Sequence, residues 1–98
     1  MLVEYIRDKN RNPIGCIVAI CKDGESNVSY GISLHNPKDE YDRSLGRQIA
    51  IGRAYSYDPE DPTKWIPDQI PAKKKTLVEN TLNNVVFRAN RYFKQVQE

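Results

Sequence analysis

The chain has 98 residues and a formal net charge of +2, from 15 Lys and Arg against 13 Asp and Glu. This length is enough for one modest hydrophobic core, so we expect residues 1–98 to form a single domain. So small a net charge excludes a polycation that coats duplex DNA, and nucleic acid is therefore not an expected partner.

The two cysteines and the hydropathy of the chain bear on its compartment. Cys16 and Cys21 lie five positions apart in one expected strand, so they point to opposite faces and do not pair. Two cysteines without a disulfide framework fit a reducing cytoplasm. The first residues lack the basic flank and long apolar run of a signal peptide, and no apolar stretch reaches the roughly 20 residues of a membrane span. We expect a cytoplasmic protein without a membrane partner.

Residues 3–34 predict an antiparallel β-meander of about three strands or more. Residues 3–7 alternate weakly between apolar and polar. Residues 14–21 are apolar on both faces, which is typical of a central strand. Residues 28–34 alternate regularly, which predicts a strand with one buried face. Turn-forming residues between these segments predict short connections.

Residues 42–56 predict a short helix that carries three arginines, here called the arginine helix. Asp42 is the better N-cap candidate, and Asp39 is the earlier option. Its core stripe is predicted from helical spacing: Leu45, Ile49 and Gly52. Gly46 and Gly52 each cost about 1 kcal/mol relative to alanine inside a helix. We therefore expect something to approach this helix closely.

The C-terminal half is predicted as a loop followed by a long helix, which makes the whole an α+β fold. Residues 58–71 contain four prolines and four acids, which exclude a regular helix or a central strand. Trp65 within this Pro-rich loop predicts that it docks on the domain. Residues 72–97 follow a helical rhythm over about seven turns, with this predicted buried face: Val78, Leu82, Val85, Val86, Ala89 and Phe93. Such a helix overhangs a small sheet, so we expect a second copy to cover its exposed apolar residues.

Residues for catalysis are scarce. The single histidine is His35, and Cys16 and Cys21 lie in a strand that we expect to be buried, so a cysteine–histidine pair is not supported. No zinc-ligand spacing, calcium loop or phosphate loop is present. We expect no enzyme, no metal and no cofactor.

Residues that hold and position anionic ligands are frequent instead. Arginine matches phosphate oxygens bidentately, and aromatic rings stack on bases. The candidate ligand-binding residues are Arg43, Arg47, Arg53, Tyr41, Trp65, Arg88, Arg91 and Asn84. Simpler explanations stay open at this point: a solvated helix face for the arginines, an amphipathic core edge for the tyrosines, and a contact between subunits for Asn84.

Three segments carry a resemblance to a known family: Tyr5-Ile6-Arg7-Asp8, Pro13-Ile14-Gly15, and residues 36–54 from Asn36-Pro37-Lys38-Asp39 through Leu45-Gly46-Arg47-Gln48-Ile49-Ala50-Ile51-Gly52-Arg53-Ala54. They resemble small phage-encoded proteins, and the family they match best is the first type of Thoeris anti-defence protein. The resemblance covers residues 3–56 by motif and the remainder by architecture. Only Arg43, Arg47 and Arg53 are carried over on matching motif, whereas Arg88, Arg91 and Trp65 are assigned by role.

The resemblance implies a fold and a function. Members have an N-terminal antiparallel sheet before C-terminal helices. They act in the host cell cytoplasm as non-catalytic sponges, which sequester cyclic ADP-ribose isomers made by host TIR-domain immune enzymes without cleaving them. Some also hold cyclic oligonucleotides at a second site. They form homodimers or higher homo-oligomers with the ADP-ribose site between subunits.

A second function stays open from the residues alone. A small phage protein can instead bind and inhibit a host protein, such as a polymerase, a nuclease or another defence protein. The Pro-rich loop with Trp65 and the uneven distribution of charge suit that function equally well. Thermal stabilisation by a nucleotide would separate the two, because a tight ligand stabilises the folded state.

Overall fold

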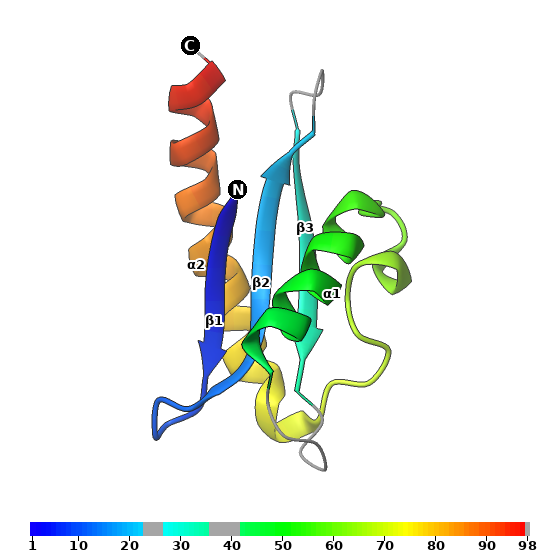
Figure 1. Ribbon diagram of the computed structural model, residues 1–98, viewed down its shortest axis with the longest axis vertical. Coiled ribbons are helices and arrows are strands. Elements are labelled where there is room, and N and C mark those ends of the chain that lie inside the picture. Colours follow the sequence, from blue (N-terminus) through cyan, green and yellow to red (C-terminus); the bar gives the residue numbers. More distant parts are fainter. Residues whose placement is uncertain (23–26, 36–41, 98) are drawn as a thin grey trace.

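The computed structural model describes residues 1–22, 27–35 and 42–97, with side chains described as far as residue 93 (Figure 1). A three-stranded antiparallel sheet in the order β1-β2-β3 is followed by two helices, the second of them long. The predicted α+β fold is confirmed. The elements are β1 (Leu2–Arg7), β2 (Pro13–Cys21), β3 (Val28–Leu34), α1 (Arg43–Tyr55), the 3-10 helix η1 (Pro62–Lys64) and α2 (Ala72–Gln97).

β2 is the central strand, as its apolar residues on both faces predict, and the helices cover opposite faces of the sheet (Figure 1). Ile17 and Ile32 belong to the core beneath α2. Cys16 and Val18 belong to a separate core beneath α1. Cys21 packs on the α2 side, so the two cysteines do lie on opposite faces, and no disulfide joins them.

α2 packs on the sheet through the predicted face. Val78, Val85, Ala89 and Phe93 are buried. Leu82 and Val86 are partly buried and pack against the same core. The helix continues past the N-terminal end of β1 (Figure 1).

The prediction that β3 has one buried face is wrong, because α1 covers the other. Ser29 and Ser33 on that face are only 3% and 4% exposed. Gly31 explains the close fit: a Cβ atom at this position would lie 2.0 Å from the backbone oxygen of Ala50. What approaches the arginine helix closely is therefore the sheet, and a glycine of β3 permits it.

The predicted core stripe of α1 is also wrong. Leu45 is 54% exposed and Ile49 is 41% exposed, and nothing lies within 4 Å of a Cβ built on Gly52. The buried residues of α1 are Ala50 and Ala54. At so short a distance from the sheet, only small side chains fit between helix and strands. The face of α1 that is buried was therefore set by the available space, and not by which side chains are most hydrophobic.

The start of α1 follows the prediction. Asp42 Oδ1 accepts hydrogen bonds from the backbone N–H groups of Ser44 (2.9 Å) and Leu45 (3.1 Å), as an N-cap does. The alternative cap Asp39 and the candidate Tyr41 lie outside the described residues.

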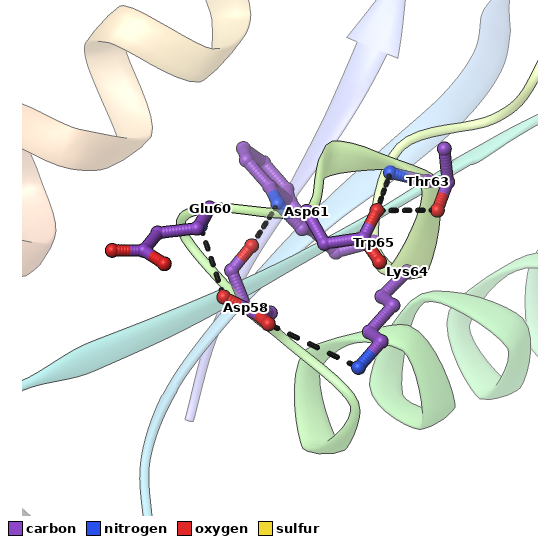
Figure 2. Close-up of polar contacts among 6 residues, drawn as sticks. All are labelled: Asp58, Glu60, Asp61, Thr63, Lys64 and Trp65. Carbon is purple, nitrogen blue, oxygen red and sulfur yellow. Dashed lines mark hydrogen bonds and ion pairs between the residues drawn. The ribbon is translucent and has the colours of Figure 1, made fainter.

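The Pro-rich loop docks on the domain, as predicted, and two of its acids, Asp58 and Asp61, bond within its own turns (Figure 2). Asp58 Oδ1 accepts from the Glu60 N–H at 2.9 Å, and Asp61 Oδ1 accepts from the Thr63 N–H at 3.2 Å. Asp58 Oδ2 also lies 3.9 Å from Lys64 Nζ. The Trp65 indole N–H donates to the Asp58 carbonyl at 3.1 Å.

Candidate functional site

Two of the three motif arginines, Arg43 and Arg47, here called the outward arginines, have exposed side chains on the first two turns of α1. By helical spacing they share the stripe of α1 that carries the buried Ala50 and Ala54. The Arg43 guanidinium carbon lies 4.8 Å from the centre of the Tyr5 ring on β1, within cation–π distance. This pair of arginines on a helix fixed to the sheet is the candidate anion-binding surface.

The third motif arginine is used inside the fold. Arg53 Nη1 donates to the carbonyl oxygen of Ile32 on β3. Nearby, Ser33 Oγ donates to the Gly46 carbonyl at 2.8 Å. These two bonds and the contact at Gly31 hold α1 in one position on the sheet, so Arg53 is a structural residue of this surface.

The Cys16 thiol is held in an inert form. Burial raises the pKa of the Cys16 thiol, and the Ser33 hydrogen bond and the positive charge of Arg47 oppose that rise only in part. The thiol therefore stays protonated at neutral pH and is a poor nucleophile. The described residues contain no group of three or more His, Cys, Asp or Glu that could hold a metal ion.

The candidates on α2 form a second cluster around β1. Glu4 Oε1 accepts from Asn84 Nδ2 at 2.8 Å, and Glu4 Oε2 accepts from Arg88 Nη1 at 2.9 Å. The Arg91 guanidinium carbon lies 5.9 Å from the centre of the Phe87 ring. This cluster lies on the α2 face of the sheet, whereas Arg43 and Tyr5 lie on the α1 face. Within one chain the two sets therefore cannot close around one ligand.

Trp65 lies in a third place. Its ring packs against Tyr57, with centroids 4.9 Å apart, and against Tyr30, with centroids 6.4 Å apart. Its backbone oxygen accepts from the N–H of Ile32 at 3.0 Å. These contacts make Trp65 an anchor of the Pro-rich loop, away from the helix arginines.

Beside this anchor is a cleft of about 480 Å³ that the sequence reasoning missed. Its volume is in the range of small-molecule sites. Burial, and then the neighbouring Tyr57, raise the pKa of the Tyr30 hydroxyl. Asn90 of α2 lines this cleft. The frequent asparagines of α2 were the one feature of the sequence that could have indicated a binding site here. The cleft is lined by Lys22, Asn27, Val28, Ser29, Tyr30, Tyr57, Pro59 and Asn90.

Comparisons with protein-family models, with curated proteins and with solved structures find no match to this chain. In the described part of the chain, neither helix has an apolar stretch of the length needed to cross a bilayer.

Proposed function

We propose that the protein is a non-catalytic sponge that binds a cyclic nucleotide immune signal of the cyclic ADP-ribose type. By this proposal it is a phage protein that acts in the host cytoplasm, where sequestration of the signal blocks TIR-based defence. The observation that carries the proposal is the outward pair Arg43 and Arg47 on a helix that Arg53 and Gly31 fix to the sheet. The sequence resemblance centred on this helix supports it.

The chemistry of the pair suits a diphosphate. Two guanidinium groups can each bind phosphate oxygens bidentately. The hydrogen bonds of Arg53 and Ser33 and the close approach at Gly31 already fix α1 on the sheet. Little conformational freedom is therefore lost when the ligand binds. Tyr5 beneath Arg43 keeps that guanidinium over β1. The protonated Cys16 thiol offers no nucleophile, so the bound ligand is released unchanged.

A second copy completes the site in this proposal. Arg88, Arg91 and Asn84 lie on the other face of the sheet, so they cannot reach an anion on Arg43 and Arg47 of the same chain. Leu45 and Ile49, on the opposite side of α1 from the arginines, are exposed apolar side chains of the kind that a homo-oligomer covers. Together with the resemblance, they lead us to place the ligand at a boundary between subunits of a homodimer or larger homo-oligomer.

Replacement of the outward arginines tests this function. Titration calorimetry with cyclic ADP-ribose isomers should show that Arg47→Ala weakens binding by about 1.5–3 kcal/mol, as for a lost hydrogen bond to a charged group. Lys73→Ala, which removes an exposed cation from the first turn of α2 on the other face of the sheet, should bind normally. Arg53→Ala should lower the melting temperature, because the Ile32 carbonyl loses its donor. Unchanged affinity in Arg43→Ala and Arg47→Ala alike would overturn the proposal.

The fate of the ligand separates a sponge from an enzyme. The protein should deplete the cyclic nucleotide from solution and return it intact after heat denaturation. A linear or hydrolysed product would contradict the non-catalytic part of the proposal, and His35 would be the first residue to replace.

Inhibition of a host protein is the second candidate function. The observation that favours it is the outer edge of β1, beyond which the described residues supply no further strand.

A further inference from the structure

The two edges of the sheet differ in whether their outward backbone N–H and C=O groups have partners. At the β3 edge, the N–H of Ile32 donates to Trp65 and its C=O accepts from Arg53, so both groups point away from β2. Ile32 is paired with Ile17, whose peptide groups therefore point toward β1. The β3 edge is thus covered by the Pro-rich loop and by α1.

The β1 edge follows from the same register. Ile17 is paired with Glu4, so the N–H and C=O of Glu4 point inward to β2. Those of its neighbours Val3 and Tyr5 then point outward. Among the described residues, neither has a backbone partner on that side. An open row of donors and acceptors of this kind is a template for one more strand.

A groove lies next to this open edge. Its volume is about 280 Å³, and its lining residues are Leu2, Phe87, Arg88, Arg91 and Tyr92. Phe87 is 62% exposed and Tyr92 is 44% exposed, so large aromatic side chains face solvent here. Figure 1 shows the C-terminal half of α2 alongside β1, where it would flank a strand added to that edge.

We propose that β1 and this groove bind an extended acidic peptide segment of another protein, which pairs with Val3 and Tyr5 as a fourth strand. Main-chain hydrogen bonds supply affinity in this mode, and alternate side chains supply specificity. One face of the added strand meets Phe87 and Tyr92. This surface is separate from the outward arginines of α1, so the inference does not depend on the nucleotide function.

Charge selects an acidic partner over a second copy of the chain. None of the groove residues is acidic, and the Glu4 carboxylate is already occupied by Asn84 and Arg88. If two copies paired through β1, both α2 helices would lie on the same face of the joined sheet. Arg91 of each copy, which has no acidic partner among the described residues, would then approach its counterpart. An acidic segment would instead neutralise this guanidinium charge.

A yeast-displayed library of random 12-residue peptides tests the inference. Sorting with the wild-type protein should enrich peptides that alternate apolar and acidic residues. Val3→Pro removes an outward N–H and is tolerated on an edge strand, so a folded Val3→Pro protein should show no such enrichment. Circular dichroism and the melting temperature check that this variant is folded. Equal enrichment by both proteins, or none by either, would overturn the proposal.

A synthetic peptide of the enriched sequence separates strand pairing from simple charge attraction. Methylation of alternate backbone nitrogens should weaken its binding at least about tenfold, because those donors pair with β1. Arg91→Glu should weaken it by a similar factor, whereas Lys73→Glu, the same charge change far from the groove, should not. Equal binding of a lysine-for-acid peptide would contradict the acidic partner. Sedimentation of the wild type as a dimer that Val3→Pro dissociates would assign the edge to a second copy.

Discussion

Gly31 sets the distance between α1 and the sheet, and with it the position of the outward arginines. A methyl group there would overlap the backbone oxygen of Ala50, which belongs to a helix held at several other points. We expect Gly31→Ala to lower the free energy of unfolding by about 3 kcal/mol, at the upper end of overpacking costs. Urea denaturation measures it.

Gly52→Ala is the matched control, because its Cβ meets open space. It should instead stabilise the protein by about 0.5–1 kcal/mol through helix propensity. A Gly31→Ala protein as stable as the wild type would show that α1 can shift away from the sheet freely.

The buried Tyr30 hydroxyl makes stability depend on pH in the alkaline range. Its pKa is raised above the ordinary value of 10.0 by burial and by Tyr57. Below pH 10.0 both folded and unfolded states keep the proton, so the stability contribution is fully present. Above it the unfolded state ionises first, and the contribution is lost as pH rises through the folded pKa. Tyr30→Phe should flatten this alkaline loss in urea titrations, whereas Tyr55→Phe, at an exposed ring, should not.

At the scale of elements, the strands and helices could be predicted from period and turn chemistry, but the buried face of α1 could not. Residues 28–34 and 72–97 were predicted with the observed bounds of β3 and α2, because long regular patterns and prolines mark them. Leu45 and Ile49 have helical spacing, yet Ala50 and Ala54 are buried. Which stripe faces the sheet depended on the close approach at Gly31, a tertiary fact that no local pattern contains.

The candidate site could be predicted only in part, for a related reason. Residue type indicated which side chains can bind anions, and Arg43 and Arg47 do face solvent. The residues around Arg53 and Trp65 do not indicate that these two residues bond to Ile32 at the edge of β3. There the Ile32 carbonyl needs a donor and the Ile32 N–H needs an acceptor. Those needs arise only when the sheet is assembled.

Trp65 anchors the Pro-rich loop at the outer edge of β3, so replacing it should weaken the hydrogen bonding of β3. Trp65→Ala removes the ring from the contacts with Tyr30 and Tyr57 and the donor to Asp58. We expect the loop to detach locally and the Ile32 amide, which donates to the Trp65 carbonyl, to exchange with solvent much faster. Hydrogen exchange followed by NMR measures this, with Tyr55→Ala as a control. Unchanged protection of Ile32 would show that the loop holds without its anchor.

At the scale of the whole molecule, two exposed apolar surfaces remain: one on α1 with Leu45 and Ile49, and one beside β1 with Phe87 and Tyr92. We assign the first to contact between copies of the chain. It lies on the same turns of α1 as the outward arginines, on the other side of the helix. The second is flanked by Arg91, which has no acidic partner among the described residues and would repel its counterpart in a symmetric pair.

Ile49→Lys tests this assignment, because it places a charge in the expected subunit interface without touching the core. Sedimentation velocity at micromolar concentration should show a dimer or larger species for the wild type and a monomer for Ile49→Lys. The same variant should lose nucleotide affinity, since the site would be incomplete in one chain. Phe87→Lys should keep both assembly and nucleotide binding. If Phe87→Lys alone dissociated the protein, the interface would belong to the overhanging part of α2, as expected from the length of that helix. A wild-type protein that stays monomeric would leave Arg43 and Arg47 without a second subunit, and the enclosed site between subunits would have to be abandoned.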